Sequence, residues 1–135
     1  MLTSIIKLNI NSFFLFFSHL QGMAFTIEER QSLGIHGLLP ACVKTQDEQV
    51  KLCKLNVERY DSDLNKYIYL MGLQDRNERL FYKLLQENVE EYMPLVYTPT
   101  VGLACQKYGL IFRRPRGLFI SIHDKGHVYE VLKNW

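Results

Sequence analysis

Tyr97 lies in residues 95–102 (LVYTPTVG), between an apolar dipeptide and a Thr-Pro-Thr turn. Proline fixes its own backbone and restricts the residue before it, so this turn is suited to aiming the phenol at a single place. Tyrosine phenols are protonated at neutral pH, which suits them to donating a proton. Without further support, the pattern favours an ordinary half-buried tyrosine, with a proton donor as the alternative.

Two other groups of residues have side chains that could take part in chemistry. Arg113, Arg114 and Arg116 stand together in residues 113–120 (RRPRGLFI), and guanidinium groups suit carboxylate and phosphate ligands. A solvated basic loop is the favoured alternative to such an anion cradle. Asp124 and His127 are types that bind metals, but two residues without a third ligand nearby indicate a metal site only weakly.

The three cysteines, Cys42, Cys53 and Cys105, are widely spaced and form no CxxC pair. We predict free, buried thiols of a reducing compartment. The sequence also lacks GxGxxG, GxxxxGK[ST], GxSxG and HExxH motifs. From pattern alone, the functional interpretation stops at a helical domain.

The composition limits the class of partner. The chain has 135 residues, 47% hydrophobic and 22% charged, which is typical of one soluble globular domain. Its 16 basic and 14 acidic residues give a formal net charge of +2, too balanced to predict a nucleic acid or an anionic membrane as partner. The apolar run at residues 13–17 is far shorter than the roughly 20 residues that span a bilayer.

Residues 1–21 differ from the rest of the chain, with one lysine, no acidic residue and many Phe, Leu and Ser residues. Pyrimidine-rich codons encode these three types. We therefore expect a leader foreign to the domain, derived from translated intron, with a targeting segment as the alternative.

Helix signals begin after this leader. Thr26 with Glu29 and Thr45 with Glu48 form capping boxes, which predict helices to about residue 33 and about residue 60. Apolar spacing predicts further helices over 64–73 and 75–87, weakened between them at Gly72.

The second half of the chain predicts a change of structure. Pro94 should stop the helices, and a helical turn should follow from residue 100 to about 108. Residues 117–122 are rich in strand formers and predict a buried strand, with a last helix from residue 127 to 135. A lone strand needs a partner, so we expect the chain to be cut short at Trp135.

Five blocks of residues resemble the N-terminal region of the malic enzymes. They are residues 22–30 (GMAFTIEER), 34–40 (GIHGLLP), 73–78 (LQDRNE), 97–106 (YTPTVGLACQ) and 114–120 (RPRGLFI). The resemblance implies a mainly α fold: a helical malic enzyme N-terminal domain over 22–112, then the first β-strand of a truncated α/β substrate domain over 113–135.

The resemblance also implies an activity, the oxidative decarboxylation of L-malate to pyruvate and CO2 with NAD or NADP and Mg2+ or Mn2+. In the family, the tyrosine of the Tyr-Thr-Pro-Thr block, here Tyr97, protonates C3 of the enol left after CO2 is lost. The family's lysine partner, metal carboxylates and dinucleotide site lie beyond Trp135. We therefore expect this fragment to be inactive alone and to bind neither cofactor nor metal tightly.

Three more positions match family sites. Asp124 and His127 match residues of the dimer interface, so subunit contact outweighs the metal hypothesis for them. Arg76 matches an arginine that binds the activator fumarate, but Leu52 and Lys44 replace its family partners, so Arg76 is expected to be an allosteric remnant.

The resemblance implies a homo-oligomer, dimeric or tetrameric, located in mitochondria or the cytoplasm. Residues 22–25 (GMAF) resemble the mitochondrial forms more closely. The alternative function is a non-catalytic short isoform that acts as an oligomerisation module for full-length subunits.

Overall fold

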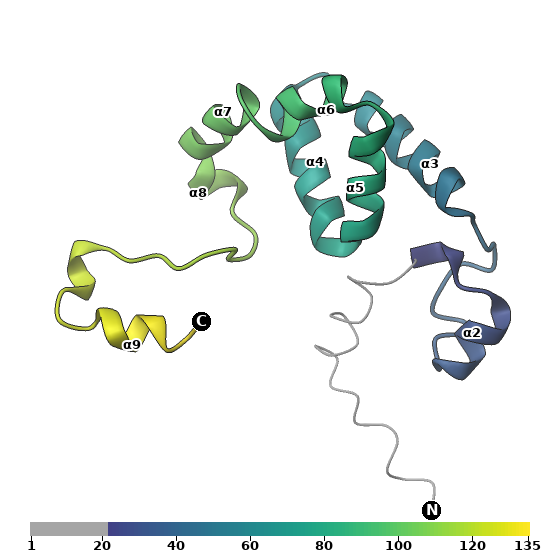
Figure 1. Cartoon of the computed structure of the whole chain (residues 1–135), viewed down its shortest axis with the longest axis horizontal. Coiled ribbons are helices and arrows are strands. Elements are labelled where there is room, and N and C mark those ends of the chain that lie inside the picture. The colour runs from purple at the N-terminus through teal and green to yellow at the C-terminus, as the bar shows by residue number, and fades with distance from the viewer. Residues whose placement is uncertain (1–21) are drawn as a thin grey trace, which may run out of the picture.

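A computed structural model describes residues 22–135, and within them the chain is mainly helical (Figure 1), as predicted. The predicted leader, residues 1–21, lies outside the described residues. The helices are two 3-10 turns, η1 (Gly22–Ala24) and η2 (Ile122–Asp124), and the α-helices α2 (Ile27–Ser32), α3 (Gln46–Glu58), α4 (Asp63–Arg76), α5 (Glu78–Glu87), α6 (Val89–Val96), α7 (Thr100–Gln106), α8 (Tyr108–Ile111) and α9 (Val128–Leu132).

Both predicted capping boxes are present at the starts of α2 and α3. The Thr26 hydroxyl accepts from the Glu29 amide at 3.2 Å, and the Glu29 carboxylate accepts from the Thr26 amide at 2.8 Å. Thr45 and Glu48 make the same pair of contacts at 3.2 and 2.8 Å. These bonds satisfy amides that a helix start leaves without partners.

Arg30 joins the first segments to one another. Its side chain is 2% exposed and donates to four backbone carbonyls, those of Phe25 (2.9 Å), Pro40 (2.7 Å), Met23 (3.2 Å) and Cys42 (3.3 Å). A buried charge needs such compensation. Arg30 thus fixes the loops on both sides of α2.

The main core lies where α3, α4, α5 and α6 meet. Its largest fully buried side chains are Leu70 and Leu73 from α4, Leu84 from α5 and Tyr92 from α6. Val50, Cys53 and Val57 extend it from α3. The apolar spacing that predicted helices over 64–73 and 75–87 includes Leu70 and Leu84 of this core.

Two predicted helix boundaries were wrong. α4 continues through Gly72 to Arg76. Asn77 is both the C-cap of α4 and the N-cap of α5, and its side chain accepts from the Leu80 amide at 3.0 Å. Pro94 lies inside α6, which continues to Val96. Because α6 is short, the proline removes one amide donor near the end of the helix and shortens the helix little.

The predicted buried strand at residues 117–122 is absent. Residues 118–121 are extended, exposed and followed by η2, and the described part of the chain contains no strand. An extended segment becomes a strand only when a neighbour satisfies its backbone groups. The last helix, α9, is shorter than predicted, covering Val128–Leu132.

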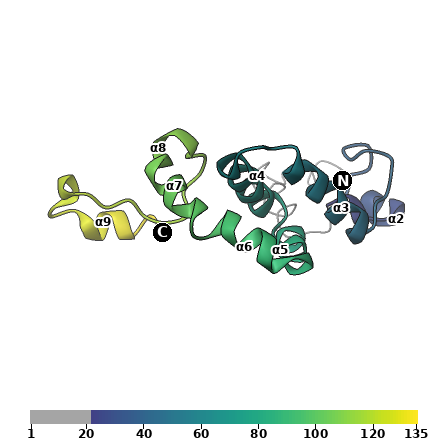
Figure 2. The same cartoon turned by 90° about the horizontal axis from the view of Figure 1, so that it is seen from above.

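The elements are laid out along one direction, with α2 and α3 at one end and α9 at the other (Figure 2). α9 contributes no buried residue. Within the described residues, no helix has both the length and the hydropathy to cross a bilayer.

Candidate functional site

Tyr97 stands at the joint between α6 and α7. Its amide donates to the Met93 carbonyl at 2.8 Å and so closes α6, while its carbonyl accepts from the Val101 amide at 2.8 Å and so opens α7. The Thr98–Pro99 peptide between them is cis. The backbone on both sides of Tyr97 is therefore held by helical hydrogen bonds.

The Tyr97 side chain is 64% exposed, so the half-buried tyrosine expected from the sequence was wrong. Its hydroxyl has no hydrogen-bond partner among the described residues. A fixed backbone with an accessible phenol is the arrangement that a proton donor needs, because the reacting carbon must reach the hydroxyl.

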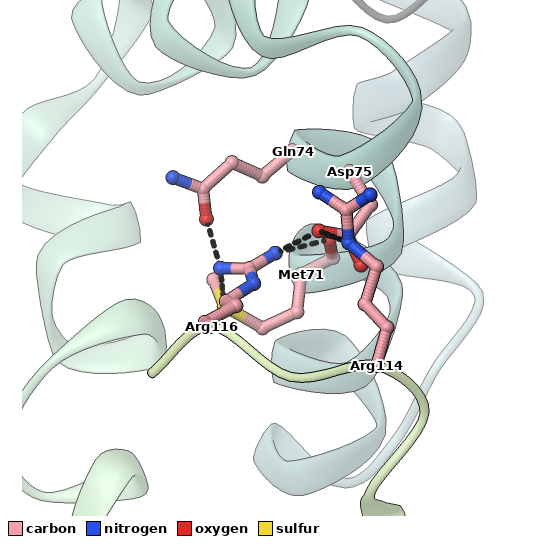
Figure 3. A network of polar contacts seen from close by, with 5 residues as sticks. All are labelled: Met71, Gln74, Asp75, Arg114 and Arg116. Atoms are coloured by element: carbon pink, nitrogen blue, oxygen red, sulfur yellow. Dashed lines mark hydrogen bonds and ion pairs between the residues drawn. The ribbon is translucent and has the colours of Figure 1, made fainter. Parts of the chain in front are cut away.

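Arg114 and Arg116 fasten the segment after α8 to α4 (Figure 3). The Asp75 Oδ1 atom meets Arg116 Nη2 at 2.5 Å and Arg114 Nε at 3.1 Å. Arg116 also donates to Gln74 Oε1 at 2.6 Å and to the Met71 carbonyl at 3.1 Å. We call Asp75, Arg114 and Arg116 the Asp75 clamp.

The clamp changes the interpretation of the arginine cluster. Arg114 and Arg116 donate hydrogen bonds to the Asp75 carboxylate of the same chain. These two side chains therefore form neither an empty anion-binding site nor a merely solvated loop. Arg113 has no side-chain partner within the described residues and keeps all its donors. Sequence reasoning missed Asp75 as their partner, because nothing local signals a contact across about forty residues.

Arg76, the predicted allosteric remnant, is exposed at the end of α4 and interacts with Tyr69. The Tyr69 hydroxyl also interacts with the Cys53 thiol. Burial is the main cause that raises the pKa of both Tyr69 and Cys53. Cys53 therefore stays a protonated thiol at neutral pH, which makes it a poor nucleophile.

The cysteines are free, as predicted, but only Cys53 is buried. Cys42 and Cys105 are exposed, which corrects the expectation that all three are buried. Cys42 lies in the loop before α3 and Cys105 on α7, where the local sequence does not reveal which face meets the core.

Asp124 and His127 lie close in sequence but do not act together as ligands. The Asp124 carboxylate accepts from the Ser121 amide at 2.7 Å and from the Ser121 hydroxyl at 3.0 Å, closing a capping box around η2. His127 is exposed just before α9. Over residues 22–135, no three His, Cys, Asp or Glu side chains form a group that could hold a metal ion.

Comparison with known proteins shows what the chain is similar to. The sequence model of the malic enzyme N-terminal domain matches residues 74–135. The chain is 66% identical over 115 residues to the NADP-dependent malic enzyme of Anas platyrhynchos, covering 85% of this chain and 21% of that enzyme. The chain is therefore similar in sequence to the N-terminal region of malic enzymes. It is also 64% identical over 115 residues to the mitochondrial NADP-dependent malic enzyme of Homo sapiens, covering 85% of this chain and 19% of that enzyme.

The chain thus spans about one fifth of the length of the malic enzymes it matches. The matched family region includes Arg76, Tyr97, Asp124 and His127. It also crosses the domain boundary expected at residue 112, which stays a prediction.

Proposed function

We propose that this chain supplies the proton-donating segment of a malic enzyme that converts L-malate into pyruvate and CO2. The observation that carries the proposal is Tyr97, held at the α6–α7 joint with an exposed phenol, in a chain 66% identical to an NADP-dependent malic enzyme. The names of the relatives favour NADP over NAD as the hydride acceptor.

The proposed reaction needs NADP+ and a base. Malate would give the hydride of C2 to NADP+ and its hydroxyl proton to the base, and the resulting oxo acid would lose CO2 to leave the enolate of pyruvate. The Tyr97 O–H bond then breaks as a C–H bond forms at C3, which gives pyruvate. The phenolate then recovers a proton from the protonated form of that base, which by family resemblance would be a lysine of the complete enzyme.

The described residues do not supply a metal site, and the sequence carries no Gly-rich dinucleotide fingerprint. We therefore assign no step to a metal or cofactor held by this chain. The chain's own contribution is the positioned phenol.

The same proposal gives the chain an assembly and a location. Exposed His127, with the η2 turn that Asp124 stabilises, forms part of a contact between subunits of a homo-oligomer. We place the protein in mitochondria, on residues 22–25 and on a human relative named as mitochondrial, with the cytoplasm as the alternative. Fractionation of cells that express the natural protein decides between the two compartments.

The first test is the activity of the isolated chain. The purified 135-residue protein, given L-malate, NADP+ and Mn2+, should produce no NADPH above a blank without protein. Sustained NADPH production would show that this chain alone holds a complete site and would overturn its proposed role as one segment of a larger one.

The second test isolates Tyr97 in a chimera. The 115 matched residues replace the corresponding segment of the Anas platyrhynchos enzyme, and the chimera should oxidise malate. Tyr97→Phe should lower kcat by on the order of 10²- to 10⁴-fold, the range for loss of a general acid.

Tyr129→Phe is the matched control, because it removes the hydroxyl of another exposed tyrosine. It should leave kcat unchanged. An active Tyr97→Phe chimera with unchanged kcat would contradict the proton-donor role.

A further inference from the structure

A pocket lies between α4, α8 and the segment that follows α8. One wall is apolar and combines Ile68 and Met71 of α4 with Ile111 and Phe112 beyond them. The pocket has a volume of about 130 Å³. For scale, an apolar cavity of about 150 Å³ holds benzene, so this space fits a group the size of one aromatic ring.

The other wall is cationic. Arg113, Arg114 and Arg116 line it, and Asp75 is the one acidic side chain among the lining residues. Three guanidinium groups against one carboxylate leave a formal excess of two positive charges. The pocket therefore favours an anion at this wall and disfavours a cation.

The donors at this wall are not all used. Arg116 donates from both terminal nitrogens to α4, while Arg114 meets Asp75 through Nε. The terminal nitrogens of Arg114 and the whole guanidinium of Arg113 have no partner in the described part of the chain. A carboxylate at the rim would accept from these nitrogens without breaking the Asp75 clamp.

We propose that this pocket binds an aromatic monocarboxylate, with the ring against the apolar wall and the carboxylate on Arg113 and Arg114. Apart from the arginines and Asp75, the lining residues are Gly72, apolar side chains and the neutral tyrosines Tyr67 and Tyr108. A second negative group placed away from the arginines would therefore lose water without gaining a cationic partner. The pocket thus selects against dicarboxylates such as malate. Tyr97 is not among the lining residues, so this binding site does not depend on the proposed function.

The probe is phenylacetate, titrated into the 15N-labelled 135-residue chain and followed by amide chemical shifts. We expect saturable shifts at Gly72 and Ile111 with a Kd on the order of 1 mM, an affinity within reach of a ligand of this size. Phenylacetamide keeps the ring and the shape but lacks the charge. It should bind at least about tenfold more weakly, which corresponds to about 1.4 kcal/mol.

Gly72→Leu tests the pocket itself. A Cβ at Gly72 meets no atom within 4 Å, so the side chain can occupy the pocket without a clash. Binding of phenylacetate should be lost in Gly72→Leu and retained in Gly72→Ala, which changes the helix in the same way but leaves the space. Circular dichroism confirms that both variants remain helical.

Arg113→Gln tests the cationic wall and leaves both Asp75 ion pairs intact. It should weaken phenylacetate about tenfold, whereas Lys51→Gln, at an exposed lysine on α3 outside the pocket, should have no effect. Three results would each overturn the proposal: no saturable shift at about 10 mM phenylacetate, equal binding of acid and amide, or unchanged binding in the folded Gly72→Leu variant.

Discussion

Asp75 is the residue through which the segment after α8 is attached to the helical core. Its Oδ1 atom meets guanidinium nitrogens of Arg114 and Arg116 at 3.1 and 2.5 Å, and its side chain is largely shielded from water. Because both arginines are more exposed than Asp75, water screens part of the attraction. The contact therefore contributes more to local order than to global stability.

We predict that Asp75→Asn lowers the free energy of unfolding by only about 1 kcal/mol but speeds amide exchange across residues 112–121. Hydrogen exchange measured by mass spectrometry gives the local effect, and urea titration the global one. Glu87→Gln, which removes the exposed 3.7 Å pair with Lys83, is the control and should leave residues 112–121 unchanged. Unaltered exchange in Asp75→Asn would show that the clamp does not hold this segment.

Tyr92 presents the opposite case, a polar group in the core without compensation. The side chain is 1% exposed, and its hydroxyl has no hydrogen-bond partner in the described residues. Burial, with smaller effects from Glu91 and Glu58, raises the pKa of Tyr92 to about 12. The ionised form is thus disfavoured in the folded state.

We predict that Tyr92→Phe stabilises the chain by about 1 kcal/mol at pH 7, because an unpaired buried hydroxyl is removed. The raised pKa also predicts the direction of the alkaline effect. Below about pH 10 the tyrosine is protonated in both the folded and the unfolded chain, so its ionisation does not lower the free energy of unfolding. Between about pH 10 and 12 the unfolded chain ionises first, and the free energy of unfolding falls.

Urea midpoints at pH 7 and at high pH measure both effects. Tyr92→Phe should raise the stability at pH 7 and reduce the loss of stability at high pH. Tyr82→Phe, at an exposed position, should change neither quantity. A Tyr92→Phe protein that is clearly less stable at pH 7 would mean that the hydroxyl has a partner after all.

For single residues, the sequence predicted which side chains could take part in chemistry better than it predicted their exposure and their contacts. The turn around Tyr97 was visible because proline and threonine act locally, but its exposure depends on which helices pack nearby. The partner of Arg114 and Arg116 could not be foreseen, because any of the 14 acidic residues satisfies the same pattern. Arg30 was missed for the same reason, since its partners are backbone carbonyls that have no sequence signature.

Among the elements, the start of α3 offers a direct test of capping. Hydrogen bonds from Thr45 lower the pKa of Glu48 below its usual 4.5. The backbone amide of Thr45 has the largest effect, and its hydroxyl has the next largest. A depressed pKa means that this contribution to stability is present above about pH 4.5 and is lost as the pH falls through the folded value.

We predict that Thr45→Ala destabilises the chain by about 1 kcal/mol at pH 7. Glu48→Gln should remove the part of the acid sensitivity that arises from this carboxylate. The matched control is Ser62→Ala, because Ser62 occupies the N-cap of α4 without a side-chain capping bond and should cost much less. Urea titrations at pH 7 and pH 3 check all three variants, and equal costs for Thr45→Ala and Ser62→Ala would contradict the capping argument.

Element boundaries were predictable where the signal was complete within one turn. The capping boxes of α2 and α3 are of this kind. Asn88 is another such signal that we missed: it accepts from the Glu91 amide at 3.3 Å and donates to the Glu91 carboxylate at 2.8 Å. The strand at residues 117–122 failed because strand propensity describes a surface that a neighbour must complete.

At the scale of the whole molecule, the two halves differ in how they bury apolar side chains. Helices α3 to α6 enclose a shared core, whereas the segment from residue 118 to 135 lies to one side of it (Figure 2). Large apolar side chains stay exposed along this segment: Leu118, Phe119, Ile120, Ile122, Val128, Tyr129, Leu132 and Trp135. Surfaces of this kind mark interaction sites or association-prone regions.

We predict that the 135-residue chain self-associates through this segment as its concentration rises. Ile122, which is 78% exposed, and Phe119 are the side chains to change, because a charge there costs nothing in the core but opposes apolar contact between chains. The double variant Phe119→Lys and Ile122→Lys should shift sedimentation velocity profiles toward monomer and lower the fluorescence of bound anilinonaphthalene sulfonate. Leu38→Lys, at an exposed position before α3, adds a charge elsewhere and should leave association unchanged. If the double variant associates as strongly as the unchanged chain, the contact lies outside the C-terminal segment. The helical surface of α3 to α6 then becomes the face to test.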